Sequence, residues 1–411
     1  MYYIDSKVDK PDIEYLIDRV EKCVKDGIQV ANVKEIYMEA LEIQKRVKTE
    51  IEVEYGIENI NSADDREKYL KKNCSKDILK ICYNESTRKW TTNGVALKEL
   101  SELGYKWATK VLRYRKIGKF VSTLGQIANE TRGDGRLHPK INVGKTNRIN
   151  YVEPALMNIQ RSIIWKVLKP RKNGNKIVSV DIKNQEPWIL INMLNIKDLL
   201  EIMKKEKEKG LYEELYKIVY GKECDEIKKA EFKRSWNALT YGGSLNTIKP
   251  ICRNIDAVVI NNYFKKIKEF KKYKRECKEA ADRDVQKVHT YFETELYADD
   301  LGRKLMRQLM DMKVQGTGTD ILALLVQHFD EEIGEWYGKV DIYFTRHDEL
   351  VLEIDKELYD TEGEERIVAR LKEIFEHKVD DWEPFRVEVK FIDEEELKLE
   401  DILEMEEEVE E

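Results

Sequence analysis

Few residues in this sequence can interrupt a helix. Seven prolines and twenty glycines are spread over 411 residues. Apolar side chains recur at three- and four-residue steps over residues 12–30, 33–54 and 96–126, and this spacing predicts three long amphipathic helices. The part of the third segment from Lys106 to Lys119 carries basic residues and no acidic ones. A charged helix face is usually just solvated, but charges of one sign favour contact with phosphate groups.

Short β-branched segments predict a small sheet. Residues 176–182 (KIVSVDI) resemble a strand, and residues 339–354 resemble two strands around a tight polar turn at 346–348. A further strand is expected at 385–391, after a helix at 364–377. Because residues 188–329 are mostly helical in pattern, the predicted fold class is α+β, mostly helical, with a small antiparallel sheet.

Three acidic residues lie where these strands end. Asp181 ends the first strand, and Asp348 and Glu349 occupy the turn of the hairpin. Acidic residues at strand ends are commonly turn residues. If the sheet brings the ends together, Asp181 and Asp348 cannot both stay ionised at close range without a cation. In phosphoryl-transfer sites such a pair of carboxylates usually binds two Mg²⁺ ions. Two interpretations of these residues therefore remain, as ordinary turn residues or as ligands of a metal site.

A stripe of polar residues follows one predicted helix. Lys229, Lys233, Asn237 and Tyr241 are spaced four apart and share one helix face, and Gly242 would end that helix. One interpretation is a solvated stripe that ends in a tyrosine. The other is a phosphate clamp beside an aromatic platform on which a base stacks.

Composition and charge exclude several classes of protein. The chain is 41% hydrophobic and 37% charged, too apolar for a disordered chain. It has no apolar run long enough to span a bilayer and no signal-peptide pattern, which predicts a cytosolic protein. The net charge is −7, but the acidic residues are concentrated after residue 391, so the preceding body is mildly basic. Such a body is compatible with a polyanionic partner.

Together, these segments resemble family A DNA polymerases, the bacterial DNA polymerase I type. Asp181 followed by Glu186 is similar to motif A of that family, and His347-Asp348-Glu349 is similar to the motif C triplet. Motif B spacing is matched by Lys229, Lys233, Tyr241 and Gly242. Further similar segments lie at 146–148 with 154–159, at 307 with 315–317 and 320–321, and, for the thumb, at 25–30 and 114–119. The resemblance covers about residues 20–391.

The resemblance implies the right-hand polymerase fold of thumb, palm and fingers. The expected boundaries are an N-terminal extension at 1–19, a thumb at 20–130, a palm at 131–187 and 301–391, fingers at 188–300, and an acidic tail at 392–411. About twenty residues precede the thumb-like segment, so we expect no proofreading exonuclease domain. A minimal polymerase core of this kind suits a phage, a plasmid or another mobile element.

The resemblance also implies an activity and a set of functional residues. The chain is expected to add dNTPs to a primer 3′-hydroxyl with two Mg²⁺ ions, for which Mn²⁺ would substitute. The implied metal ligands are Asp181, Asp348 and the backbone carbonyl of Ile182, and the implied catalytic residues are Asp181, Asp348, Glu349 and Lys233. The implied nucleotide-binding residues are Lys229, Lys233, Tyr241, Glu186, Asn237 and Tyr212. The implied DNA-binding residues are Arg148, Asn158, Arg307, Gln315, His347 and Lys119.

Glu186 is expected to exclude ribonucleotides by filling the space of the 2′-hydroxyl. The related single-subunit RNA polymerases, which accept ribonucleotides, typically lack this glutamate.

The sequence departs from the family pattern at several of these positions. Lys229 replaces an arginine, Tyr212 a histidine, Asn237 an aromatic residue, Met157 a glutamine and Asp311 an asparagine. These departures leave two alternatives open. One is a polymerase with altered template use, by reverse transcription, translesion synthesis or template-free addition; the other is a catalytically silent primer–template binding module.

The expected partners are primer–template DNA, dNTPs and an accessory protein that adds processivity. No membrane partner is expected, and the chain is expected to be a monomer in the cytoplasm of a bacterial or phage-infected cell.

Overall fold

The chain divides into two compact units in a computed structural model that describes residues 2–84, 89–158, 161–205, 210–283, 285–298 and 305–392. Unit 1 comprises residues 1–26, 139–152 and 170–392, and unit 2 comprises residues 27–138 and 153–169. The predicted acidic tail lies, apart from Ile392, outside the described residues. The predicted domain boundaries remain predictions.

The centre of unit 1 is a four-stranded antiparallel sheet with the strand order β11-β12-β8-β14. The strands are β8 (Lys176–Ile182), β11 (Val340–Arg346), β12 (Glu349–Ile354) and β14 (Val387–Phe391). Five of the seven residues of β8 are buried, because both edges of the strand are paired and both faces are covered. The strands predicted from residues 176–182, 339–354 and 385–391 are therefore confirmed.

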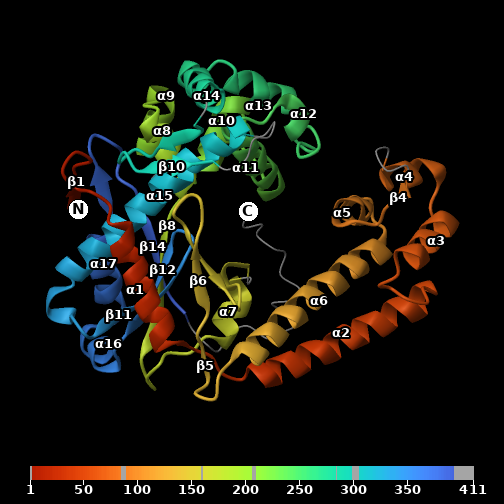
Figure 1. The fold of residues 1–411 in the computed structure, drawn as a ribbon. Helices are drawn as coiled ribbons and strands as arrows, with labels where there is room; N and C mark the ends of the chain where they lie inside the picture. The colour runs from red at the N-terminus through yellow and green to blue at the C-terminus, as the bar shows by residue number, and fades with distance from the viewer. Residues whose placement is uncertain are drawn as a thin grey trace. The chain divides into compact units, whose positions relative to one another are not determined.

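Helices lie around this sheet (Figure 1). They are α1 (Ile13–Asp26), α8 (Gln185–Met193), α15 (Leu305–Glu332), α16 (Lys356–Glu362) and α17 (Glu364–Phe375). Helices α1 and α17 contact strands β11 and β14, respectively. Helix α15 contacts α1, α8 and α17, and most of its residues from Val314 to Val326 are buried. A Cβ atom added at Gly318 would approach Gln185 Oε1 to 2.7 Å, so a side chain at this position would require the Gln185 side chain of α8 to move. Glycine at this position therefore leaves room for the Gln185 side chain.

The remaining helices of unit 1 form a cluster around aromatic side chains. They are α9 (Lys197–Lys205), α10 (Leu211–Tyr220), α11 (Glu226–Thr240), α12 (Leu245–Ile248), α13 (Ala257–Phe264) and α14 (Lys268–Ala281). The Trp236 ring lies 4.4 Å from Phe264 and 5.7 Å from Phe232 between ring centroids. The Tyr273 hydroxyl of α14 donates a 2.6 Å hydrogen bond to the Met310 carbonyl of α15, and this joins the cluster to the long helix.

Three small strand pairs and a 3₁₀ turn complete unit 1. They are β1 (Tyr2–Ile4) with β13 (His377–Val379), β6 (Lys140–Val143) with β7 (Ile149–Val152), β9 (Lys287–His289) with β10 (Glu295–Tyr297), and η2 (Gly334–Trp336). The β1–β13 pair is parallel, and the other two are antiparallel hairpins. The first residues of the chain are thus part of the folded unit.

Unit 2 is built on two long helices, α2 (Val33–Tyr55) and α6 (Lys106–Glu130), which lie side by side (Figure 1). Its other helices are α3 (Ala63–Asn73), α4 (Lys76–Ile81), α5 (Gly94–Glu102), α7 (Arg161–Val167) and the 3₁₀ turn η1 (Leu156–Asn158). Its short strands are β2 (Ile28–Gln29) with β5 (Arg136–Leu137), and β3 (Tyr83–Asn84) with β4 (Lys89–Trp90). None of the helices in the described part of the chain is long and apolar enough to cross a membrane.

Two of the predicted helices are shorter than expected. The segment predicted over 96–126 is two helices, because Gly104 takes a φ of 87° and Tyr105 is extended before α6 begins. The segment predicted over 12–30 ends at Asp26, since Gly27 has a φ of 84° and residues 28–29 form a strand. The apolar spacing continues across both breaks, so periodicity alone does not reveal them.

A buried histidine contributes to the pH dependence of the stability of unit 1. His377 is 1% exposed, stacks on Phe385 and lies 4.7 Å from His328 between ring centroids. Burial lowers the pKa of His377 to about 4. The unfolded chain therefore binds a proton that the folded chain does not, over the range from about pH 6.5 down to about pH 4. The stability that depends on neutral His377 is present above this range and is lost as the pH falls through it.

We expect His377→Phe to reduce this acid sensitivity. Between pH 7 and pH 5, the wild-type chain should lose about 2 kcal/mol more unfolding free energy than the variant. Buried carboxyls with a raised pKa, such as Asp320, act in the opposite direction but act equally in both proteins. Urea unfolding at both pH values measures the difference, and equal losses in the two proteins would contradict the prediction.

Candidate active site

Two aspartates meet at the end of the central sheet. Asp181 is the penultimate residue of β8, and Asp348 lies in the turn that joins β11 to β12. The Ile182 amide donates a 3.4 Å hydrogen bond to the Asp348 carbonyl, and Glu349 is directly in register with Asp181. The antiparallel pairing of β8 with β12 therefore brings together two residues that are far apart in the sequence.

The electrostatics of this pair fit a divalent cation. Burial, and secondly the nearby Asp181 carboxylate, raise the pKa of Asp348 to about 7. A cation between the carboxylates would offset both the cost of burying the Asp348 charge and its repulsion by the Asp181 carboxylate. Within the described residues, no group of three or more His, Cys, Asp or Glu side chains could hold an ion. Mg²⁺ suits such a site, because it commonly binds through one or two carboxylates and takes its other ligands from water and phosphate.

The two neighbours of Asp348 differ in environment. The Glu349 side chain is buried, accepts a hydrogen bond from the Ser179 hydroxyl and lies 4.0 Å from Arg346 Nη1. His347 is exposed and has a φ of 54°, as a turn residue between two strands can have. Glu349 is thus engaged inside the sheet, whereas His347 is presented to solvent.

A second acidic group lies at the start of α8. The Glu186 carboxylate accepts a 2.5 Å hydrogen bond from the Tyr241 hydroxyl, which follows α11, and it lies 3.4 Å from Arg148 Nη2. Burial and Glu186 raise the pKa of Tyr241 well above its usual value, so the hydroxyl keeps its proton and donates. Glu186 is therefore held from two sides.

Asp311 of α15 belongs to the same cluster. Burial, and secondly the Glu186 charge, raise the pKa of Asp311 to about 6, and Arg148 opposes the shift. Gly242 lies against the same stretch of α15, since an added Cβ atom would lie 3.1 Å from Met310 Sδ and 3.4 Å from Arg307 Cγ. The glycine after Tyr241 thus allows the end of α11 to approach α15 closely.

The predicted polar stripe lies on α11, which ends at Thr240 before Gly242 as expected. Lys229 Nζ lies 2.9 Å from Glu213 Oε1 of α10 and 2.8 Å from Glu226 Oε2 of its own helix. Lys233 Nζ lies 5.7 Å from the centre of the Tyr212 ring, and the Tyr212 hydroxyl donates a 3.1 Å hydrogen bond to Asn237 Oδ1. Each of these three stripe residues is therefore contacted by α10.

The other predicted DNA-binding residues are distributed over both units. Arg307 is exposed and Gln315 half-buried, and both belong to α15 in unit 1. Lys119 is exposed on α6 of unit 2. Asn158 is in η1 of unit 2, and its side chain lies outside the described residues. The two aspartates, Arg148, Glu186, Tyr241 and the stripe all belong to unit 1.

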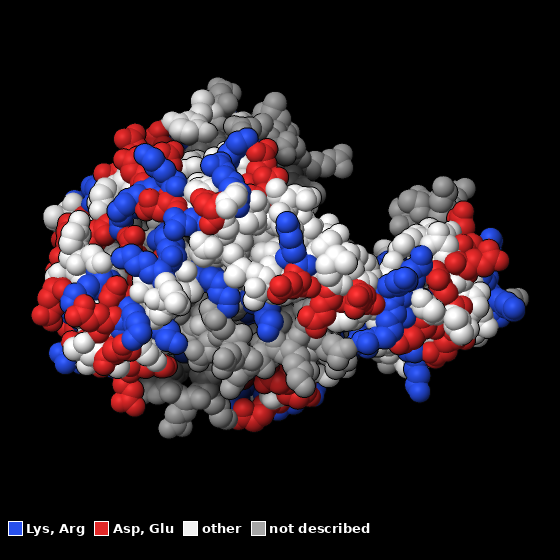
Figure 2. Space-filling model, turned by 90° about the horizontal axis from the view of Figure 1, so that it is seen from below, with Lys and Arg blue, Asp and Glu red and all other residues white. Residues whose placement is uncertain are grey.

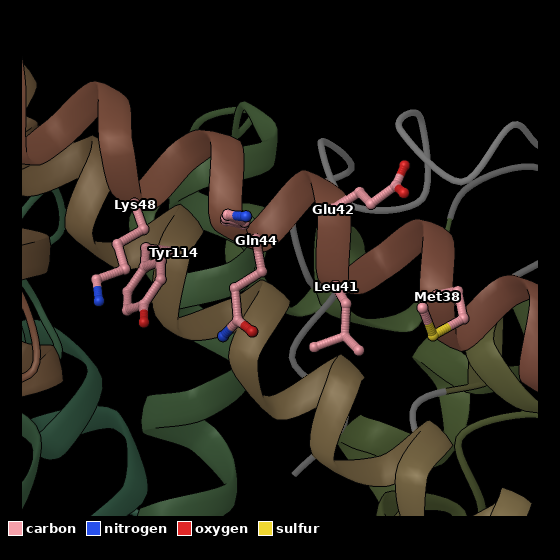
Figure 3. A pocket seen from close by; sticks show the side chains of 7 residues that line it. Met38, Leu41, Glu42, Gln44, Lys48 and Tyr114 are labelled. Carbon is pink, nitrogen blue, oxygen red and sulfur yellow. The ribbon is translucent and has the colours of Figure 1, made fainter.

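A separate cavity of about 290 Å³ lies in unit 2 between α2 and α6 (Figure 3). Its lining includes Met38, Leu41, Gln44 and Lys48 of α2 and the Tyr114 ring of α6. This lining contains neither the paired carboxylates nor the lysine stripe. The cavity therefore carries none of the chemistry of the acidic site.

Three carboxylates of the site differ in how far the sequence indicates their contacts. Glu226 is three residues before Lys229, a spacing that brings side chains together on a helix. Glu213 is sixteen residues before Lys229 and on another helix, so no sequence pattern indicates the contact. Asp311 could be named only as a departure from the family pattern, because its burial beside Glu186 depends on the packing of α15.

Comparisons with known proteins find a matching family model and several relatives. The family model for DNA polymerase family A matches residues 30–391. The chain is 28% identical to DNA polymerase I of Aquifex aeolicus over 268 residues, which are 60% of this chain and 44% of that protein. It is 25% identical to DNA polymerase I of Caldicellulosiruptor bescii over 320 residues, which are 70% of this chain and 37% of that protein. The chain thus spans less than half the length of these relatives.

A solved structure has the same fold. It is the POL domain of Pol1 from M. smegmatis in a complex with DNA primer–template and dNTP, with a TM-score of 0.74 and 19% sequence identity. The match covers 92% of this chain and 69% of that one. At this identity the likeness establishes the fold alone, and the predicted right-hand polymerase fold is confirmed.

Proposed function

Because the chain belongs to DNA polymerase family A, we propose that it extends a DNA primer along a template strand by adding dNTPs to the primer 3′-hydroxyl. The main support for this proposal is that Asp181 and Asp348 lie close together at the end of the sheet. Their carboxylates are close enough for the charge of Asp181 to raise the pKa of Asp348. Nucleotidyl transfer would use such a pair to hold the cations that neutralise charge on the triphosphate and help the hydroxyl to lose its proton.

Asp181, Asp348 and the backbone carbonyl of Ile182 would hold two Mg²⁺ ions, or Mn²⁺ in their place. When bound, these ions would lower the pKa of the primer hydroxyl and neutralise charge on the leaving pyrophosphate. The protein itself contributes positioning, since Asp181 belongs to the β8–β12 ladder and the Asp348 carbonyl accepts a hydrogen bond from the Ile182 amide. Buried Glu349, bonded to Ser179, would keep the hairpin in register.

The stripe on α11 would bind the incoming nucleotide. Lys233 would contact the triphosphate, and the Tyr212 ring beside it carries no charge that would compensate the ammonium group. Tyr241 would lie beside the templating or incoming base, and Asn237 and Lys229 would complete the nucleotide contacts. Glu186, held by Tyr241 and Arg148, would occupy the space of a ribose 2′-hydroxyl.

The primer–template would contact the residues that the motif resemblance indicates. These are Arg148, Arg307, Gln315 and His347 of unit 1, and Lys119 and Asn158 of unit 2. Figure 2 shows basic and acidic side chains intermingled on the face that it displays. Unit 2 would contain the thumb, and unit 1 the palm and the fingers. An accessory protein for processivity, a monomeric state and a cytoplasmic location are proposed from the sequence alone.

Primer extension on a DNA template tests the proposed function. We expect extension with dNTPs and Mg²⁺, none with NTPs, and none after chelation of the metal. Parallel lanes with an RNA template and with a blunt duplex test the alternative of altered template use. Binding of primer–template without extension in any lane would contradict the proposal and favour the silent binding module.

A further inference from the structure

Helix α10 contacts three successive members of the α11 stripe through two neighbouring residues. Tyr212 reaches Lys233 with its ring and Asn237 with its hydroxyl. Glu213, the next residue, reaches Lys229 with a 2.9 Å ion pair. The two lysines that face the proposed nucleotide are therefore each held by α10, but by groups of different charge.

The difference in charge affects what each lysine offers to an anion. Lys233 lies over a neutral aromatic ring, so its positive charge is not compensated by that contact. Lys229 lies between two carboxylates, and hydrogen bonds to Glu226 and Glu213 raise its pKa. An incoming triphosphate that binds Lys229 must first displace a carboxylate, whereas one that binds Lys233 displaces no charged group of α10.

Glu213 is the more buried of the two carboxylate partners. Its side chain is 27% exposed, whereas that of Glu226 is 86% exposed and its charge is largely screened by solvent. Glu226 is also on the same helix as Lys229, so it would move with the stripe. Glu213 is on α10 and restrains Lys229 from outside that helix.

We propose that Glu213 is a positioning residue that withholds Lys229 from the incoming nucleotide. Lys233 then makes the first phosphate contact. As a result, the affinity for the triphosphate is lower than the two lysines together could provide. This inference rests on the proposed function, because it requires that the chain bind dNTPs at the stripe. Glu213 need not touch the nucleotide; it acts through Lys229.

The test compares Glu213→Gln with Glu214→Gln. Both residues are acidic and lie in the first turn of α10, so both substitutions remove one charge and the same favourable interaction with the helix dipole. The measurement is the equilibrium Kd of dATP, with Mg²⁺, for the complex of the chain with a primer–template whose primer ends in a dideoxynucleotide. The turnover number on an extendable primer is measured beside it.

We expect Glu213→Gln to lower the Kd of dATP by about three- to fivefold, the size of one partly exposed ion pair, with the turnover number unchanged. Glu214→Gln should leave the Kd unchanged. In a Lys229→Gln background, Glu213→Gln should have no effect, because the restrained lysine is absent. Glu226→Gln should lower the Kd less than Glu213→Gln does.

Three results would overturn the inference. The first is a Kd of dATP that is unchanged or higher in Glu213→Gln. The second is a fall in Kd in Glu214→Gln equal to that in Glu213→Gln. The third is a fall in Kd on Glu213→Gln that persists in the Lys229→Gln background. These differ from a failure of the proposed function, in which the wild-type complex itself would bind no dATP and extend no primer. The melting temperature of each variant shows whether its fold is intact.

Discussion

Replacing Asp348 by alanine should reduce primer extension by at least about 10³-fold, because metal-ion charge stabilisation is worth several kcal/mol and each ~1.4 kcal/mol changes a rate about tenfold. The loss should not come from unfolding. Burial and Asp181 raise the pKa of Asp348 to about 7, so in the ionised form the side chain opposes folding. In the absence of metal at pH 8, Asp348→Ala should therefore melt at or above the wild-type temperature.

Asp341→Asn is the matched control for Asp348→Ala. Asp341 belongs to the same hairpin, but it pairs with Glu353 in the register, far along β11 from the turn. Its carboxylate lies 3.5 Å from Arg19 Nη2, and it is partly exposed, so its loss should change extension by less than about twofold. The single-turnover rate with saturating dNTP distinguishes the two variants. A rate for Asp348→Ala within tenfold of wild type would refute the metal-ligand assignment.

Glu186→Ala is expected to increase the use of ATP relative to dATP by about 10²-fold, the discrimination that a pocket can gain against one added hydroxyl group. The carboxylate is suited to exclude a 2′-hydroxyl because it does not move freely. The Tyr241 hydroxyl, at 2.5 Å, and Arg148, at 3.4 Å, hold it from two sides. The ratio of kcat/KM for single insertion of ATP and of dATP opposite a template thymine measures the effect.

Glu186→Gln separates the size of the side chain from its charge. Glutamine keeps the shape of the side chain and can still accept a hydrogen bond from Tyr241, but it loses the negative charge. If the exclusion is steric, Glu186→Gln should retain most of the preference for dATP while Glu186→Ala loses it. An unchanged ratio in Glu186→Ala would mean that Glu186 is not the residue that excludes ribonucleotides.

The parts of the fold that depend on local pattern could be predicted from the sequence. Most residues of the β8 strand are β-branched and apolar, with an aspartate near its end, and the β11–β12 hairpin has a polar turn between two largely apolar segments. Helix α11 ends where glycine permits a positive φ at residue 242. In each case the signal and the structure occupy the same few residues, so no knowledge of tertiary contacts is needed.

Much of the candidate site depends on contacts between distant residues and could not be predicted. The pairing of Lys229 with Glu213 requires that α10 pack beside α11 in one particular register. The raised pKa of Asp311 requires that α15 bury it beside Glu186. The motif spacing indicated which residues would meet, but the partners that hold them in place arise only from packing.

The position of β8 in the sheet also determines the order in which unit 1 can be completed during synthesis. This strand pairs on one edge with residues 349–354 and on the other with residues 387–391. At about 5–20 residues per second, a ribosome needs on the order of ten to thirty seconds to travel from β8 to β12. For that time a strand with five buried residues has neither neighbour, and unpaired apolar edges promote aggregation. A nascent chain that stops before residue 387 would still lack one edge of its central strand, so it should be recovered mainly in the insoluble fraction.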